Sequence, residues 1–245
     1  MKNNRNNKRV LLWIVLAILL IFAAGTIWYL SDDYHADSAA METIHNPSNG
    51  ITVVFQNDAY IFRPEEPKAG LIFYPGGKVD FEAYAPLMER LAEHGFLCVL
   101  LHVHQNLAVL EPNAADGVIA LFPEITGWYI GGHSLGGVIA STYAAKHRED
   151  FAGLVLLGAY STADFSGSDY RAVSIYGSED RVLSIDAYRK NRNHLPVDTI
   201  ELVLQGGCHS YFGNYGEQKG DGTPSISREE QQRLTAETIA LLCAQ

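Results

Sequence analysis

Residues 128–137 of this chain read WYIGGHSLGG. The apolar run at the start predicts a strand, the small residues from Gly137 predict a helix, and Gly132-His133-Ser134-Leu135-Gly136 between them fits the pattern Gly-x-Ser-x-Gly. A serine in such a strand-to-helix turn has a strained backbone, and side chains at the glycine positions would collide with neighbouring elements. The stretch therefore predicts a sharp turn that lifts the Ser134 hydroxyl out of the carboxyl edge of a sheet.

Short apolar runs alternate with longer amphipathic ones from Ile51 onward, which is typical of a mostly parallel sheet with helices on both faces. The predicted strands are Ile51 to Phe55, Ala59 to Phe62, Gly70 to Tyr74, Leu97 to Leu101, Trp128 to Gly132, Gly153 to Leu157, Ala172 to Tyr176 and Thr199 to Leu204. The first two flank Asn57-Asp58 and predict an antiparallel hairpin at the sheet edge. The predicted helices are Phe81 to His94, Gly136 to His147 and Ile226 to Cys243.

The composition indicates one large globular domain and argues against a nucleic-acid-binding protein. Hydrophobic residues make up 47% of the chain and charged residues 19%, which allows a substantial core. The formal net charge is -10, although the first nine residues hold four of the 18 Lys and Arg residues and no acidic one. The rest of the chain is therefore more acidic still, and an acidic surface repels a phosphate backbone.

Residues 10–30 predict a membrane-spanning helix. The run is 21 residues long and is interrupted only by Gly25 and Thr26. As a helix it would span about 30 Å, the thickness of a bilayer core. A basic tail of residues 1–9 precedes it and acidic residues follow it, so the positive-inside rule places the N-terminus in the cytoplasm and the rest of the chain outside. The predicted partner of this segment is the lipid bilayer of the cell membrane.

A cleaved secretory signal is the alternative for the same segment. Residues 22–25, Phe-Ala-Ala-Gly, offer a weak cleavage site, and the product would be secreted. The length of the run and its continuation through residues 27–30 favour an uncleaved signal-anchor. We expect residues 31–49, which are polar and carry no clear period, to be a tether, and residues 50–245 to form the extracytoplasmic folded domain.

Ser134 is the predicted nucleophile of a catalytic triad. A serine hydroxyl is a weak nucleophile near neutral pH and needs a histidine to take its proton and a carboxylate to orient the histidine. These partners are expected in the order acid, then histidine, at the ends of later strands. Asp180 follows the predicted strand that ends at Tyr176, and His209 follows the one that ends at Leu204. We therefore predict Asp180 as the acid and His209 as the general base.

Both partners have rivals in the sequence. Glu179 is the alternative acid, because it is the neighbour of Asp180 on the same loop. His194 also lies downstream of Asp180, but it precedes Leu195-Pro196 on a connection and does not follow a predicted strand. His209 is therefore the preferred base.

No metal or other cofactor is predicted. His102 and His104 form a pair after the strand that ends at Leu101, but the sequence offers no third ligand, so we expect them to line a pocket or a solvated loop. The cysteines lie far apart without the spacing of a zinc site and are expected to be structural, with no disulfide framework: Cys98, Cys208 and Cys243.

The oxyanion of a tetrahedral intermediate needs backbone N–H donors. The N–H of Leu135, just after the nucleophile, is the first candidate. The second is expected from the loop after the strand that ends at Tyr74, where the glycines of Pro75-Gly76-Gly77-Lys78 let the backbone approach closely. We predict Gly77, with Lys78 as the alternative.

These segments together resemble the α/β-hydrolase superfamily, and more narrowly the compact alpha/beta hydrolase fold-5 family, which is related to dienelactone-hydrolase-like enzymes. The resemblance covers roughly residues 51–245. It is carried by Tyr74 to Asp80, Tyr84 to Leu87, Asn106 to Leu110, Gly131 to Gly137, Tyr176 to Val182 and His209 to Gly216. It implies an α/β-hydrolase fold and assigns the triad roles to Ser134, Asp180 and His209, the residues already identified by their placement.

The chain departs from the wider superfamily in two ways. Tyr74-Pro75 stands where many members carry a His-Gly pair before the oxyanion residue. Only 45 residues separate Ser134 from Asp180, so no sizeable cap domain is expected, and an open site favours accessible or polymeric substrates. The irregular, glycine-rich segment from Tyr211 to Ser227 is expected to shape the pocket beside His209.

Hydrolysis of an ester through a Ser134 acyl-enzyme is the function that the sequence favours. Two alternatives stay open. An acyltransferase would pass the acyl group to an alcohol on an envelope component, and the choice between that alcohol and water depends on pocket shape. A non-catalytic ligand-binding protein would keep the fold, although it has no need of all three triad groups.

Overall fold

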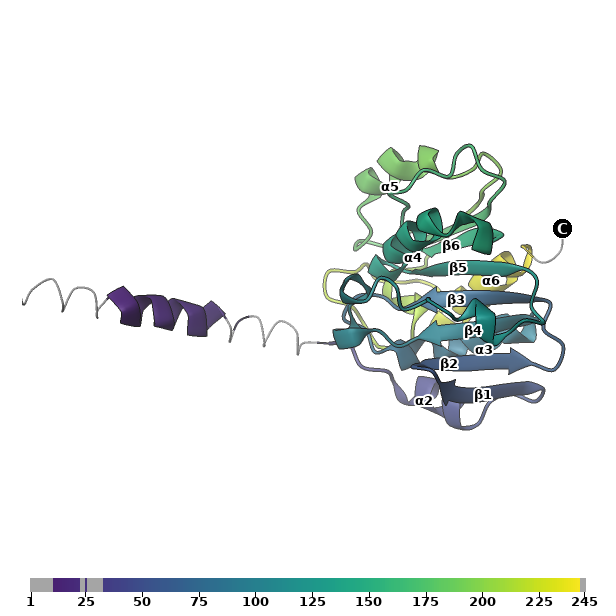
Figure 1. Cartoon of the computed structure of the whole chain (residues 1–245), viewed down its shortest axis with the longest axis horizontal. Coiled ribbons are helices and arrows are strands. Elements are labelled where there is room, and N and C mark those ends of the chain that lie inside the picture. The colour runs from purple at the N-terminus through teal and green to yellow at the C-terminus, as the bar shows by residue number, and fades with distance from the viewer. Residues whose placement is uncertain (1–10, 23–24, 26–32, 243–245) are drawn as a thin grey trace, which may run out of the picture. The chain divides into compact units, whose positions relative to one another are not determined.

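The apolar runs predicted as strands form one eight-stranded sheet (Figure 1). Each strand lies within two residues of its predicted bounds. The strands are β1 (Ile51–Gln56), β2 (Ala59–Pro64), β3 (Ala69–Tyr74), β4 (Phe96–Leu101), β5 (Trp128–His133), β6 (Gly153–Leu157), β7 (Arg171–Gly177) and β8 (Ile200–Leu204).

The strands follow the order β1-β2-β4-β3-β5-β6-β7-β8 across the sheet. β1 pairs antiparallel with β2, and β2 pairs antiparallel with β4, whereas the neighbouring strands from β4 to β8 are parallel. This confirms the hairpin predicted at the edge of a mostly parallel sheet. Because parallel strands end at the same edge, the loops after β3, β5, β7 and β8 meet there.

The computed structural model describes residues 11–22, 25 and 33–242. The chain divides into two units, residues 1–33 and residues 34–245. In the first unit, residues 11–22 are helical and their apolar side chains are exposed. No helix among the described residues has both the length and the apolar character needed to span a bilayer. The basic tail of residues 1–9 and eight residues of the predicted anchor lie outside the described residues.

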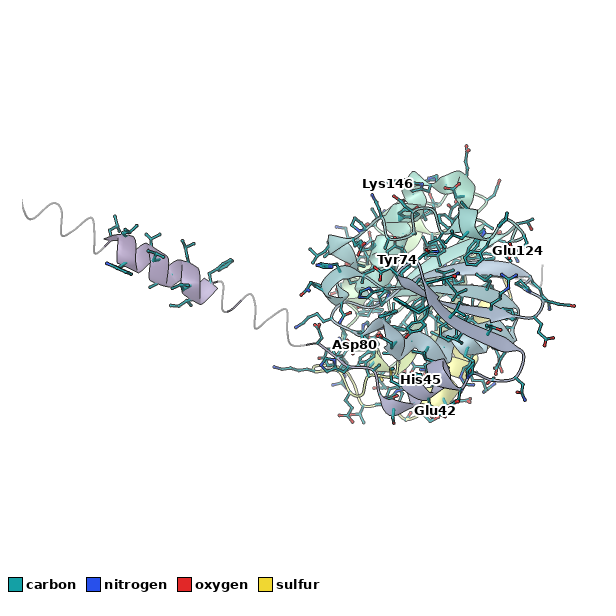
Figure 2. The ribbon with its side chains drawn as sticks, turned by 60° about the horizontal axis from the view of Figure 1, so that its bottom comes forward. Glu42, His45, Tyr74, Asp80, Glu124 and Lys146 are labelled. Atoms are coloured by element: carbon teal, nitrogen blue, oxygen red, sulfur yellow. The ribbon has the colours of Figure 1, made fainter. Side chains whose placement is uncertain are left out.

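Helices pack on both faces of the sheet. The α-helices of the domain are α2 (Ser38–His45), which packs on α3, and α3 (Ala85–Glu93), α4 (Leu135–Lys146), α5 (Ile185–Asn191) and α6 (Arg228–Ala240). β3 shows how the two faces are separated, because alternate side chains of a strand point to opposite sides. Leu71 and Phe73 join the core under α3 and α6, whereas Ile72 and Tyr74 join the core under α4. Tyr74, labelled in Figure 2, is fully buried.

The helix predicted from Phe81 to His94 is not α-helical in its first turn. Phe81–Tyr84 is a 3₁₀ helix, and the α-helix α3 begins at Ala85. Pro86 follows directly, and its missing N–H and fixed φ suit the first turn of a helix but not its interior. The proline therefore explains where the regular helix starts.

Part of the predicted tether is built into the domain. The domain unit begins at residue 34, and α2 buries Ala40 completely. Asp37 caps the N-terminus of α2, since its carboxylate accepts the Ala40 N–H at 3.0 Å. A helix of eight residues is marginal without tertiary contacts and is too short to display a clear apolar period. The sequence pattern therefore missed it.

The chain between the predicted nucleophile and acid is short and regular. All of its residues are described, and α4, β6 and β7 account for most of them. The connection from β6 to β7, residues 158–170, contains neither an α-helix nor a strand. The absence of a sizeable cap domain in this region agrees with the prediction.

Candidate active site

Ser134 occupies a strained turn at the carboxyl edge of the sheet. β5 ends one residue before it and α4 begins one residue after it, and its backbone angles are φ 53° and ψ -122°. A Cβ atom on Gly132 would lie 2.5 Å from the carbonyl oxygen of Tyr74, and one on Gly136 would lie 2.2 Å from that of Pro75. Neither position has space for a side chain, which accounts for both glycines of the pattern.

His209 and Asp180 form a buried pair. The His209 Nδ1 lies 2.8 Å from the Asp180 Oδ2, and each side chain is only 1% exposed. The second carboxylate oxygen of Asp180 accepts the N–H groups of Val182 and Leu183 at 2.9 and 2.8 Å. The neighbouring carboxylate of Glu179 instead accepts the Ser178 hydroxyl at 3.3 Å. Asp180, and not its rival, is the carboxylate that contacts the histidine.

The ring of His209 lies beside the turn that carries Ser134. Its centroid is 4.4 Å from that of His133, the residue before the serine. A Cβ on Gly158 would lie 2.9 Å from the His209 Nδ1, and the preceding Leu157 carbonyl accepts the Ser134 N–H at 2.9 Å. Within the described chain, the His209 Nε2 is buried and has no hydrogen-bond partner. That nitrogen is therefore available to take a proton.

The N–H groups of the two predicted oxyanion residues, Gly77 and Leu135, are unpaired among the described residues. A Cβ on Gly77 would lie 3.0 Å from the Leu135 Cδ2, so the two predicted oxyanion residues are neighbours. Neither N–H donates to an acceptor among the described residues. The N–H of Lys78, the alternative donor, is already bonded to the Asn106 carbonyl at 2.7 Å. The geometry therefore favours Gly77 over Lys78.

A buried tyrosine connects the loop after β3 to the serine turn. The Tyr84 hydroxyl accepts the Gly76 N–H at 3.0 Å and lies 2.8 Å from the His133 Nδ1. Donation of its single hydrogen to that nitrogen pairs the hydroxyl, the Gly76 N–H and the His133 Nδ1, while the His133 Nε2 is buried without a partner among the described residues. Burial raises the pKa of Tyr84, and burial followed by the proximity of His209 lowers the pKa of His133 far below its ordinary value. Both groups therefore stay neutral and act as a fixed brace.

Asp221, which the sequence reading did not identify, holds the loops of the acid and the histidine together. Its carboxylate accepts the N–H groups of Ser210 and Gly222 at 2.8 Å, of His209 at 3.2 Å and of Arg181 at 3.4 Å. Burial opposes its ionisation, but these backbone donors lower the pKa of Asp221 below its usual range. The segment predicted to shape the pocket thus also positions the histidine.

We expect Asp221→Asn to destabilise the protein by about 1–3 kcal/mol at pH 7, because an amide offers one acceptor where the carboxylate offers two. A folded pKa below the unfolded value of about 3.9 means that the ionic contribution is complete above about pH 4 and is lost as pH falls through the folded pKa. Urea unfolding at pH 7 and pH 3 should show the difference from wild type shrinking in acid. The exposed Asp169→Asn is the matched control, and a difference that does not depend on pH would contradict the assignment.

The other histidines that the sequence singled out either contact residues outside the site or are exposed. His102 Nδ1 lies 2.8 Å from the Asp58 Oδ1, His104 is exposed, and His194 Nδ1 lies 3.0 Å from the Ser161 carbonyl oxygen. In the part of the chain that the structure describes, no three His, Cys, Asp or Glu side chains are grouped to hold a metal ion.

The cysteines that can be located are buried. Cys98 lies in β4 and Cys208 lies next to the histidine of the site, whereas Cys243 is outside the described residues. Burial, the largest influence, raises the pKa of Cys208 to about 11. The Cys208 thiol therefore stays protonated near neutral pH and is a poor nucleophile.

The site residues described above all lie in a region that matches a known protein family. The model of the alpha/beta hydrolase family matches residues 70–233. The chain belongs to the α/β-hydrolase family. The match includes the turn at Ser134, the loops that carry Asp180 and Asp221, and His209. The protein is therefore a hydrolase of that family. No curated protein matches the sequence.

Solved structures share the fold of this hydrolase at low sequence identity. TT1662 from Thermus thermophilus has a TM-score of 0.58 and 14% identity, over 80% of this chain and 99% of its own. Est1E from Butyrivibrio proteoclasticus has a TM-score of 0.54 and 14% identity, over 80% and 100%. The esterase domain of a Rhodothermus marinus protein has a TM-score of 0.58 and 13% identity, over 78% and 97%. Identities this low establish the fold alone.

Proposed function

We propose that the hydrolase cleaves a carboxylic ester, with Ser134 as nucleophile, His209 as general base and Asp180 as the orienting acid. The observation that carries the proposal is the buried His209–Asp180 pair at 2.8 Å beside a serine in a strained turn. The esterase domain among the similar structures supports ester substrates at the level of the fold.

Each group of the site has a step in the proposed reaction. The Ser134 Oγ attacks the ester carbonyl carbon, and its proton passes to the His209 Nε2. The negative oxygen of the tetrahedral intermediate is stabilised by the N–H groups of Gly77 and Leu135. As the carbon–oxygen bond to the leaving group breaks, His209 returns the proton to the departing alkoxide. Water then attacks the acyl-enzyme with His209 again as base, which releases the acid and regenerates Ser134.

The proposal is tested by comparing the purified full chain with Ser134→Ala on a series of short-chain p-nitrophenyl esters. We expect turnover by the wild type and a loss on the order of 10⁴-fold or more in the variant. A fluorophosphonate probe should label the wild type and leave the variant unlabelled. A folded wild-type protein that neither turns over an ester nor reacts with the probe would refute esterase chemistry.

We further propose that residues 10–30 anchor the hydrolase in the cell membrane with its catalytic domain outside the cytoplasm. The support is the 21-residue apolar run with basic residues before it and acidic residues after it. The described helical stretch, residues 11–22, carries exposed apolar side chains, for example Trp13 at 71% and Phe22 at 73%.

Fractionation of a bacterial host that expresses the full chain tests this location. The hydrolase should remain in the membrane pellet after a carbonate wash, and protease added to intact spheroplasts should digest it. Recovery in the culture medium would favour the cleaved signal, and protection from protease would contradict the proposed orientation.

A further inference from the structure

Residues 34–37, here called the strap, lie against the loop that carries Gly77. The Tyr34 N–H donates to the Lys78 carbonyl at 2.7 Å, and the Tyr34 carbonyl accepts the Asp80 N–H at 2.9 Å. These bonds form a parallel bridge between Tyr34 and Val79. The strap precedes the region matched by the family model, which begins at residue 70. It reaches the loop of Gly77 from a part of the chain that precedes β1.

The strap completes the hydrogen bonding of the oxyanion loop. On one side of Gly77, the Gly76 N–H is held by the Tyr84 hydroxyl. On the other side, the N–H of Lys78 is held by the Asn106 carbonyl and its C=O by the strap. Lys78 has φ of 63°, a left-handed conformation that a residue with a side chain adopts only when its surroundings enforce it. These contacts hold the backbone on both sides of Gly77, whose own N–H has no acceptor among the described residues.

The carboxylate of Asp80 strengthens this arrangement. One oxygen lies 3.0 Å from the His35 Nδ1 and accepts the Ala36 N–H at 3.3 Å, both from the strap. The other accepts the Asn106 side-chain amide at 3.0 Å. In Figure 2, Asp80 is labelled on the same side of the domain as Glu42 and His45 of α2, the helix that follows the strap.

The other contacts of the strap reach the loop after His209. The Tyr34 hydroxyl accepts the Lys219 N–H at 3.1 Å, and its ring lies 5.6 Å from that of Tyr215. The Asp37 N–H donates to the Asn214 carbonyl at 2.8 Å. The Asp37 carboxylate accepts the Asn214 side-chain amide at 3.2 Å and Arg228 at 3.1 Å. The strap therefore joins the oxyanion loop to the loop that follows the histidine.

We propose that the strap is a positioning element of the oxyanion hole, with Tyr34 as its main positioning residue. Its backbone holds the Lys78 carbonyl, and its side chain anchors the strap to Lys219 and Tyr215 so that this backbone stays in place. Loss of the side-chain anchor would let the strap shift and the Gly77 N–H turn away from where the negative oxygen forms. This inference rests on the proposed esterase function. A strap that only stabilised the fold would change the fraction of folded protein and leave the chemistry of each folded molecule unchanged.

The test uses the full chain with Tyr34→Ala and counts active sites by titration with the fluorophosphonate probe. Per labelled site, we expect kcat to fall about 10- to 100-fold with KM within about twofold, because a misplaced donor weakens the transition state and not substrate binding. A trifluoromethyl ketone, which forms an anionic adduct with the serine, should bind more weakly by the same factor. Tyr34→Phe keeps the ring beside Tyr215, so its kcat should fall less than that of Tyr34→Ala. Glu42→Gln, at an exposed residue, is the control.

A second variant keeps the inference testable if Tyr34→Ala does not fold. Asp37→Ser retains a capping side chain for α2 but removes the carboxylate contacts with the Asn214 side chain and Arg228. We expect about a 3- to 10-fold fall in kcat per labelled site. Normal kcat and normal ketone affinity per site in the folded variants would overturn the inference while leaving esterase function intact. A wild type without turnover or labelling would overturn both.

Discussion

Asp180→Asn is expected to lower kcat on an ester by about 10⁴-fold. In the wild type, one carboxylate oxygen of Asp180 accepts the N–H groups of Val182 and Leu183 at 2.9 and 2.8 Å. In the variant, only the amide oxygen can accept these two N–H groups, so it takes that position. The amide NH₂ must then face the His209 Nδ1, which it forces to accept a hydrogen bond. The proton of the neutral imidazole moves to Nε2, and the base that Ser134 needs is lost.

Glu179→Gln is the matched control for this prediction, since the two carboxylates are adjacent on one loop and the Glu179 side chain bonds Ser178. We expect its kcat to stay within about twofold of wild type. Steady-state kinetics on the same ester, with fluorophosphonate counting of active sites, separates the two variants. A large loss in Glu179→Gln together with a small one in Asp180→Asn would transfer the acid role to Glu179.

Gly136→Ala is expected to destabilise the domain by about 3 kcal/mol or more. The new methyl group would lie 2.2 Å from the Pro75 carbonyl oxygen and 2.4 Å from that of Tyr74, and both are backbone atoms that cannot rotate away. Relief requires α4 to move from the end of β3, which would also displace Ser134 from the oxyanion loop. Activity should therefore fall even in the fraction that folds.

Thermal unfolding checks this expectation, with Gly127→Ala as the matched control. A Cβ on Gly127 meets no atom within 4 Å. At about 2–4 °C per kcal/mol for a domain of this size, Gly136→Ala should lower Tm by about 6–12 °C and the control by less than about 2 °C. Equal stability of the two variants would show that the close packing of Gly136 does not matter for the fold.

The strands and the serine turn were predictable because their signals are local. β6, Gly153–Leu157, is buried along its whole length and appears in the sequence as an uninterrupted apolar run. The turn at Ser134 is identified by glycines whose small size is required at Gly132 and Gly136. In each case the position requires one kind of residue, apolar in the buried strand and glycine in the crowded turn. The residue type alone therefore indicates the structure.

The contacts that hold the site in place were less predictable because each depends on two distant segments. The choice between Asp180 and Glu179 depends on where His209 lies after folding, 29 residues away from Asp180. Asp221 is one acidic residue in an irregular glycine-rich segment, and nothing local marks it as a brace. The strap has no periodic pattern, and its Tyr34 meets Lys219 across 185 residues.

The sequence by itself determined the α/β architecture, the strand order along the chain and the places where Ser134, Asp180 and His209 follow strands, because burial and steric limits select residue types one position at a time. Only the tertiary structure decided which carboxylate meets the histidine, why Gly77 and not Lys78 has a free N–H, and that the strap bonds to the loop that carries Gly77. Those outcomes depend on hydrogen bonds to backbone groups, which every residue type carries and which therefore leave little trace in the sequence.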